Sequence, residues 1–297
     1  IMLVVLLEAW SRRQARYHHT SNRYSKLVQY PFGGWLRLLA TLVCVLPVAF
    51  GFIIPAVQLF IWAMQTWRQV VDTSFLALIG HSIELAAITS LVAIGLSLFV
   101  AYGKRVMSTP LTRIIVRFLG MGYAIPGTVI AIGVLIPFAW VDNSIDAWMR
   151  SHMDISTGLL FSGTIFALVF AYLVRFLPVS LNTVEAGLSK IRPSMDEVGR
   201  SMGLKAGTIL AKVHVPMLKG SILTAALLVF VDVLKELPAT LILRPFNFNT
   251  LAIRTYELAN EERLADAANP ALAIVLVGII PVIILSRSIS RARPGND

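Results

Sequence analysis

The chain has 297 residues, of which 57% are hydrophobic and only 14% charged. An average soluble domain is about 45–50% apolar and about 25% charged, so a soluble fold would lack the polar side chains to cover its surface. The mean hydropathy of +0.75 also excludes an intrinsically disordered chain. The composition therefore predicts an all-α, polytopic membrane protein.

The net charge of +10 has two interpretations. A nucleic-acid-binding protein carries its basic residues on one face of a soluble domain, whereas a membrane protein gathers them on its cytoplasmic side. The positions of Lys and Arg along the chain decide between these classes. The single cysteine, Cys44, has no second thiol to form a disulfide with and lies in an apolar run, so we expect a packing residue.

Residues 1–34 precede the first candidate span. The chain opens with seven apolar residues, from Ile1 to Leu7, followed by Glu8; this run is too short to cross a bilayer. No basic stretch precedes it, as one would in a signal peptide. We expect residues 1–34 to hold the end of a helix whose start is missing and a basic cytoplasmic connector, and the chain to be part of a longer polypeptide.

Six stretches are apolar over about 20 residues, the length that crosses a bilayer as a helix. They lie within residues 38–67, 85–103, 118–141, 155–174, 220–241 and 267–286. The first has room for a helix and an interfacial segment around Trp62 and Trp67, because tryptophan suits the membrane surface. The predicted division is a first span with an outer loop at 35–80, a transmembrane domain at 81–290 and a cytoplasmic tail at 291–297.

Alternating the sides from a cytoplasmic N-terminal segment places 20 of the 26 basic residues in the cytoplasm. The cytoplasmic set is Arg12, Arg13, Arg16, Arg23, Lys26, Arg37, Lys104, Arg105, Arg113, Arg117, Arg175, Lys190, Arg192, Arg200, Lys205, Lys212, Lys219, Arg287, Arg291 and Arg293. This bias predicts that both ends of the chain are cytoplasmic. It also accounts for the pI of about 10.1 without a nucleic-acid partner.

The longest cytoplasmic loop, at about residues 185–219, reads as a helix–turn–helix outside the bilayer. Ser194 and Glu197 have the spacing of a capping box, with serine as the N-cap and glutamate at the third helical position. Gly203 is placed to end this short helix in the left-handed conformation that glycine tolerates. A second helical stretch, residues 204–215, leads through Pro216 into the fifth span.

Residues of this loop have the spacing of a known signature. They are Glu197, Val198, Gly199, Gly203, Val213, Val215 and Pro216. The arrangement resembles the Glu-Ala-Ala signature of ABC importer membrane subunits: Glu-Ala-Ala, three residues, Gly, nine residues, then Ile-x-Leu-Pro. Glu197, Gly203 and Pro216 match outright, small residues replace the two alanines, and valines replace Ile and Leu.

The resemblance implies the type I, MetI-like importer fold and a set of partners. In that family the loop docks into a separate ATPase subunit, so Glu197 would brace the docking segment and Gly203 would allow its turn. The chain has no P-loop of its own, since its one Gly-Lys pair, Gly103-Lys104, lacks the other required residues. No cofactor is expected on this chain; ATP and Mg²⁺ would bind two partner ATPase subunits, beside an extracytoplasmic substrate-binding protein and a second permease half.

Further stretches are similar to ferric-iron permeases of the bacterial inner membrane. They are residues 15–20, 123–133, 235–245 and 250–258. Members of this family are often two six-helix halves in one chain, which implies that this sequence is a C-terminal half. The implied activity is ATP-driven import of ferric iron by alternating access, with no covalent chemistry on the chain itself.

Charged residues near the ends of spans are candidates for a translocation path or gate. They are Glu84, Asp232, Lys235 and Glu236, followed by Pro238. Ions inside a membrane are costly, so they usually face a polar interior or pair with one another. Their spacing lets Asp232, Lys235 and Glu236 share one helix face. A structural ion pair between helices is the alternative.

Other polar residues give weaker signals. The five histidines, His18, His19, His81, His152 and His214, are scattered along the chain, so we expect no histidine metal site. Residues 257–266 hold four acids and one arginine, and we expect a short amphipathic outer helix that touches a binding protein or only solvent.

Two alternatives to the iron permease stay open. In the first, the class holds and the substrate is thiamine, a phosphonate or a polyamine. The second alternative is a different class, an ion-driven secondary transporter or a membrane enzyme, and it leaves the signature loop unexplained. A secondary transporter would require acids at the membrane midplane, and an enzyme would require a catalytic cluster; the sequence shows neither.

Overall fold

The computed structural model describes residues 33–291, and within this range the chain is helical with no strand. The elements are α2 (Gly34–Val48), η1 (Ala49–Ile53), α3 (Ile54–Val70), α4 (Thr73–Val106), α5 (Pro110–Leu119), η2 (Gly122–Ala124), α6 (Gly127–Met153), α7 (Ile165–Ser189), α8 (Ser194–Ser201), α9 (Ala206–Ile209), η3 (Leu210–His214), α10 (Val215–Met217), α11 (Lys219–Leu234), α12 (Pro238–Leu243), α13 (Leu251–Asn260) and α14 (Leu264–Arg291). The predicted all-α class is confirmed. The helix end and connector predicted within residues 1–34 lie almost wholly outside the described residues, as does most of the predicted tail.

Five helical runs of the described chain are long and apolar enough to cross a membrane. They are Gly34–Val70, Thr73–Val106, Gly127–Met153, Ile165–Ser189 and Leu264–Ile283. A sixth span results if α9–α10 and α11, which meet at a bend of 81°, are counted together. The chain is a multi-pass membrane protein, and each of these runs overlaps one of the six stretches predicted from hydropathy.

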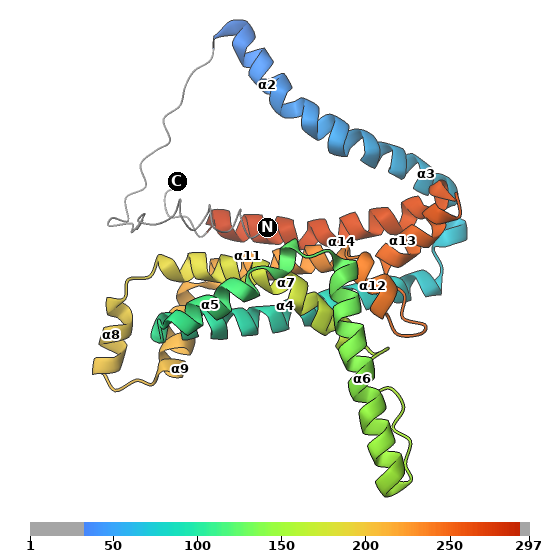
Figure 1. Ribbon diagram of the computed structural model, residues 1–297. Helices are drawn as coiled ribbons and strands as arrows, with labels where there is room; N and C mark the ends of the chain where they lie inside the picture. Colours follow the sequence, from blue (N-terminus) through green and yellow to red (C-terminus); the bar gives the residue numbers. More distant parts are fainter. Residues whose placement is uncertain (1–32, 292–297) are drawn as a thin grey trace.

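Helices α4, α7 and α11 pack against one another as the core of the bundle, and α14 lies beside α11 (Figure 1). Small side chains line the contact, with Ala86, Ala93 and Ala171 fully buried. In a bilayer, where lipid tails are as apolar as leucine, helices associate through such close approach of their backbones. Tyr172 and Leu168 fill the centre of the same cluster.

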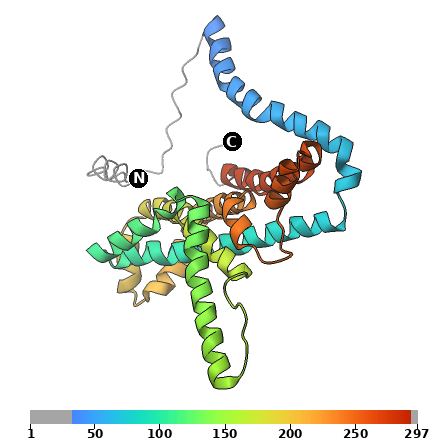
Figure 2. The same cartoon turned by 45° about the vertical axis from the view of Figure 1, so that its right-hand side comes forward.

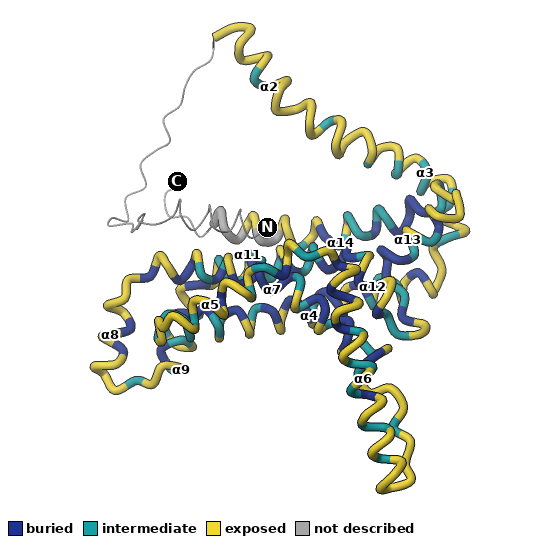
Figure 3. Tube along the Cα trace, in the orientation of Figure 1, coloured by how far each residue is buried: buried dark blue, intermediate teal, exposed yellow. Residues whose placement is uncertain are grey.

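The first part of the first span leaves this bundle, whereas its second part, α3, packs along α14. Helices α2 and α3 form one run through the π-helical turn η1, which lies between Pro47 and Pro55, two residues that lack the N–H of a regular helix. No residue of this run is buried, and Figures 2 and 3 show α2 extending away from the other helices. Trp62 and Trp67 lie on α3, in the second half of this continuous run, and their place at the membrane surface stays a prediction.

The predicted third span, residues 118–141, is wrong in its bounds. Helix α5 ends at Leu119, the 3-10 turn η2 follows, and α6 begins at Gly127. Pro126 has an extended backbone with ψ of 138° and lacks an N–H, so it separates the two helices. Helix α6 then continues to Met153 and projects from the side of the bundle (Figures 1 and 2).

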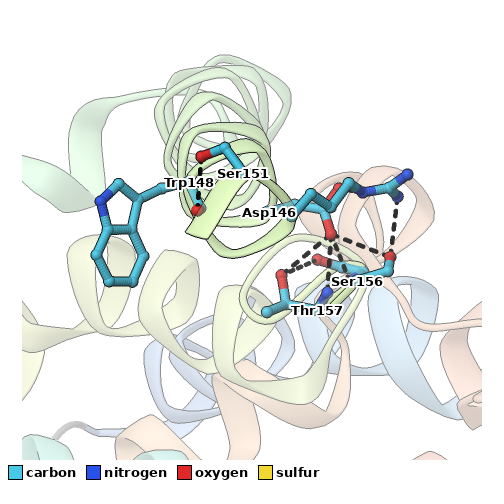
Figure 4. Close-up of polar contacts among 7 residues, drawn as sticks. Asp146, Trp148, Ser151, Ser156 and Thr157 are labelled. Carbon is cyan, nitrogen blue, oxygen red and sulfur yellow. Dashed lines mark hydrogen bonds and ion pairs between the residues drawn. The ribbon is translucent and has the colours of Figure 1, made fainter. Parts of the chain in front are cut away.

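The predicted fourth span, residues 155–174, also begins too early, because α7 starts at Ile165. Residues 154–164 instead lie along α6, held by two acids one turn apart. Asp142 accepts hydrogen bonds from the amides of residues 160–162. Asp146 accepts from the amide of Thr157 at 2.8 Å and from the hydroxyl of Ser156 at 3.1 Å (Figure 4). The apolar side chains in this segment made it resemble a span.

The amphipathic helix predicted at residues 257–266 is wrong as a separate element. These residues form the end of α13, a turn, and the first residues of α14. Glu262 has a positive φ of 61°, which no helix continues through, and Arg263 pairs with Asp266 at 2.8 Å. Asp266 therefore stabilises the turn between the two helices, whereas Glu257 pairs with Arg244 and Arg254.

Candidate functional site

Helices α8 to α10, residues Ser194–Met217, form a hairpin at one end of the bundle (Figure 1). We call it the α8–α10 segment. Gly203 makes its turn with φ of +78°, a conformation that glycine adopts without steric cost. The predicted helix–turn–helix is confirmed, although its second part begins at Ala206 and contains the π-helical turn η3.

The capping box predicted at Ser194 and Glu197 is wrong. Pro193 has helical backbone angles and is itself the N-cap residue, with no side-chain cap hydrogen bond. Ser194 is therefore already inside α8, one position too late to cap it. The Glu197 side chain is exposed and makes no hydrogen bond or ion pair within residues 33–291, which leaves it available to a partner.

The residue that braces the segment is Asp196, which sequence reasoning missed. Its carboxylate accepts hydrogen bonds from His214 Nε2 at 2.8 Å, from Arg105 Nε at 2.8 Å and from the Tyr102 hydroxyl at 3.2 Å. His214 is fully buried. One carboxylate thus joins both arms of the hairpin, α8 and η3, to the end of α4.

Arg105 extends this connection to α7. Its two terminal nitrogens donate to the backbone carbonyls of Leu188, Ile191 and Arg192, at 2.7 to 3.1 Å. These carbonyls lie at the end of α7 and in the turn after it, where a helix has no internal donors left. A planar guanidinium with five donors suits this role. The α8–α10 segment is consequently fixed to two spans.

The acidity of Asp196 follows from these contacts. Burial alone raises the pKa of a carboxyl group, but the hydrogen bonds from His214 and Arg105 outweigh it, so the pKa of Asp196 lies below its ordinary value. Asp196 is therefore a carboxylate at neutral pH. Its negative charge is matched by the Arg105 guanidinium beside it.

The remaining signature residues have distinct positions. Gly199 is buried, and a Cβ there would lie 2.8 Å from the end of the Ile209 side chain, so α8 packs on α9 only with a very small residue at this place. Val198 is exposed on the outer side of α8. Val213, Val215 and Pro216 lie on η3 and α10, before the bend into α11; the two valines are half-buried and Pro216 is exposed.

The charged candidates near α12 do not share one face, which corrects the prediction. Asp232 pairs with Lys235 at 2.9 Å, and Lys235 is well exposed. Glu236 is buried and pairs with Arg175 of α7 at 3.2 Å. The helix ends at Leu234, so the regular spacing of a helix no longer applies to Glu236.

Sequence reasoning missed Asp196, and it placed Arg175 in the wrong part of the chain. The charge count assigns it to the cytoplasmic loop, because the fourth span was predicted to end at residue 174. The structure puts Arg175 near the middle of α7, among membrane-spanning residues. A signal was present in the sequence, since apolar residues continue on both sides of Arg175, and an arginine inside an apolar run needs a buried partner.

Of the other path candidates, Glu84 is not part of this cluster; it lies exposed on α4 with no ion pair in the described chain. Pro238, the exposed first residue of α12, lies beside the cluster, because a Cβ on Gly127 would meet Pro238 Cβ at 3.2 Å as well as Glu236 and Arg175. His81 stacks on Phe248 at 4.4 Å, far in sequence from the other histidines. Among residues 33–291 no group of three or more His, Cys, Asp and Glu side chains is placed to hold a metal.

The helical fold and the loop signature define a class, the membrane subunits of ABC importers. Residues 93–293 match the family model described as the inner membrane component of binding-protein-dependent transport systems. The chain belongs to this family.

Two curated relatives have named substrates. An Fe(3+)-transport system permease protein, FbpB 2 of Haemophilus influenzae, is 27% identical over 237 residues, covering 79% of this chain and 44% of the relative. A putative 2-aminoethylphosphonate transport system permease protein, PhnV of Salmonella typhimurium, is 27% identical over 156 residues, covering 52% of each chain. The chain thus spans about half the length of these relatives.

Solved structures share the fold. A bacterial alginate ABC transporter, in complex with an alginate pentasaccharide-bound periplasmic protein, matches with a TM-score of 0.67 at 13% identity, covering 88% of this chain and 96% of the other. The MetNI methionine ABC transporter, in inward-facing conformations, matches with a TM-score of 0.54 at 17% identity, covering 76% of this chain and 100% of the other. The predicted type I importer fold is confirmed.

Proposed function

We propose that this chain is a permease subunit that moves ferric iron across the bacterial inner membrane, driven by ATP hydrolysis on separate subunits. The observation that carries the proposal is the α8–α10 segment, a hairpin fixed to α4 and α7 and bent into α11. A push on such a rigid hairpin moves three spanning helices together. The exposed Glu197 and Val198 are its contact residues for an ATPase.

Iron is the substrate that the relatives favour. The similarity to the Fe(3+) permease extends over 79% of this chain, against 52% for the phosphonate permease. The identity is 27% in both cases, so length of match rather than identity carries this choice.

The proposal includes the sides of the membrane. Basic residues are concentrated around the α8–α10 segment, and the excess of Lys and Arg in loops marks the cytoplasmic side. The segment and both ends of the chain are then cytoplasmic. An extracytoplasmic substrate-binding protein docks on the opposite side, where α13 and the loop after α12 lie (Figure 1).

A second permease half completes the transporter. The α2–α3 run has no buried residue; α3 packs along α14, whereas α2 stands away from the bundle and leaves an apolar surface for that half to cover. The second half lies either in the same polypeptide or in another chain. ATP and Mg²⁺ bind the two ATPase subunits, and this chain holds no cofactor.

Reconstitution of the transporter tests both the proposed substrate and the proposed ATP-driven mechanism. The complete transporter in proteoliposomes, with its binding protein, is expected to accumulate labelled ferric iron only when ATP is present on the ATPase side. Uptake of 2-aminoethylphosphonate or thiamine in place of iron would contradict the substrate. Iron uptake in vesicles that lack the ATPase subunits would contradict the class of mechanism.

A further inference from the structure

Two breaks between successive helices meet at one ion pair. One break separates α5 from α6 at residues 120–126, and the other separates α11 from α12 at residues 235–237. Arg175 of α7 lies between them, with its Nε 3.2 Å from Glu236 Oε2. Broken helices leave backbone groups without partners, which a bilayer tolerates only where protein supplies them.

The pair supplies those partners. Arg175 Nη1 donates to the carbonyl of Ile125, in the first break, at 3.1 Å. Glu236 Oε1 accepts from the amide of Ala239, in the first turn of α12, at 3.2 Å. Each member of the ion pair thus holds the backbone of one break, and their attraction holds the two breaks together across α7.

A second contact lies one turn away on α7. Tyr172, three residues before Arg175 and so on the same face, is hydrogen-bonded to Thr240 of α12. Thr240 also donates to the carbonyl of Glu236 at 2.6 Å. Helix α7 therefore contacts the chain after α11 through two side chains, Arg175 and Tyr172.

The junction has no spare room. A Cβ on Gly127, the first residue of α6, would lie 2.6 Å from Glu236 Oε1 and 2.9 Å from Arg175 Nη1. Arg175 Nε is within ion-pair distance of Glu236 but makes no well-aligned hydrogen bond among the described residues. The ion pair is therefore closely packed, and its two side chains are held together by the attraction of opposite charges.

Both halves of the pair are connected to the α8–α10 segment by continuous helix. Helix α7 runs from Arg175 down to Ser189, just before the segment, and α11 runs from Lys219, just after it, up to Leu234 beside Glu236. A movement that spreads α7 from α11 at the segment is carried along these helices to the ion pair. Separating buried charges is costly, so the pair opens as a discrete step.

We propose that Arg175 and Glu236 form a latch that keeps the two helix breaks closed against α7 until movement of the α8–α10 segment releases it. They act as positioning residues, since neither needs to touch the substrate. The latch rests on the ATP-driven import proposed above. Weakening it lowers the barrier to the opened state, so the transporter should hydrolyse ATP without waiting for its binding protein.

The test measures ATP hydrolysis and iron uptake by the complete transporter in proteoliposomes, with and without the binding protein. Glu236→Gln and Arg175→Gln are expected to raise hydrolysis in the absence of binding protein by about 2- to 30-fold, the range that coupling residues span. Uptake per ATP hydrolysed should fall. The exchange variant Arg175→Glu with Glu236→Arg should restore part of the coupling that either single variant loses.

A steric variant keeps the test decisive if removal of a charge prevents assembly. Gly127→Ala presses a methyl group into the pair and should also raise hydrolysis without binding protein. Gly133→Ala, on the same helix with open space around its Cβ position, is the matched control and should behave as wild type.

Wild-type behaviour of the assembled Gly127→Ala transporter, or an exchange variant no better coupled than the single variants, would overturn the latch. A wild-type transporter that takes up iron without hydrolysing ATP would overturn the proposed function instead.

Discussion

Replacing Asp196 by alanine should loosen the α8–α10 segment from α4 and α7. The substitution removes the acceptor shared by His214 and Arg105 and leaves both without it in a buried place. His214 loses the hydrogen bond of its Nε2, and its Nδ1 already has no partner in the described chain. The structure predicts a local effect on the segment, with the spans themselves intact.

The magnitude follows from burial. Removing one member of a fully buried ion pair costs about 3–5 kcal/mol. The side chains of Asp196 and Arg105 are 10% and 17% exposed, and Arg105 keeps its carbonyl acceptors, so we expect the lower end, about 3 kcal/mol. Asp196→Asn keeps an acceptor of the same shape and should cost about 1–1.5 kcal/mol, the difference between charged and neutral hydrogen bonds.

Amide hydrogen exchange of residues 194–217 in the purified protein measures this local stability. A loss of about 3 kcal/mol corresponds to exchange faster by about 100-fold, since each 1.4 kcal/mol is tenfold. Glu197→Ala is the matched control: it removes the neighbouring carboxylate, which has no partner in the described chain, and should leave exchange unchanged while lowering ATP-driven uptake. If Asp196→Ala exchanged like wild type, or if Glu197→Ala loosened the segment as much, the assignment of the bracing residue would be refuted.

The pH dependence has a defined sign. The folded-state pKa of Asp196 is lowered below the ordinary value of 3.8. The stability it contributes is therefore present above that value and is lost as the pH falls through the lower folded-state pKa. Exchange of the segment, corrected for intrinsic rates, should be constant from neutral pH to about pH 5. In Asp196→Asn the acid-induced loss should be smaller, and an equal loss would contradict the role of this carboxylate.

Three further variants probe the turn, the helix contact and the α6 projection. Gly203→Ala meets no side chain but is held at φ +78°, so thermal unfolding of the segment should show a cost of about 1–2 kcal/mol; no cost would mean that the turn is not strained. Gly199→Val should cost about 1–3 kcal/mol by crowding α9, and Gly207→Val, which has open space, less than that; equal values would contradict the contact. Asp142→Ala leaves three amides without their acceptor, so proteolysis within residues 154–164 should accelerate about tenfold or more, whereas Asn143→Ala should not change it.

The sequence was sufficient for the class, the approximate spans and the hairpin. Hydropathy is a sum over neighbouring residues, so a long apolar run predicts a spanning helix wherever its side chains later pack. The turn at Gly203 is equally local, because a positive φ depends on one residue. Spacing alone then carried the resemblance of residues 197–216 to the importer signature.

Pairings between distant residues were decided only by the tertiary structure. Asp196 and Glu197 are adjacent acids of similar chemistry, and their burial differs only because one faces Arg105 and His214 while the other faces outward. Arg175 looked like the end of a span because residues 154–164 are apolar enough to imitate one. Its place in the membrane became evident with Glu236 opposite it, 61 positions along the chain. Hydropathy sums and residue spacing describe one segment at a time, whereas an ion pair between helices depends on how the helices pack.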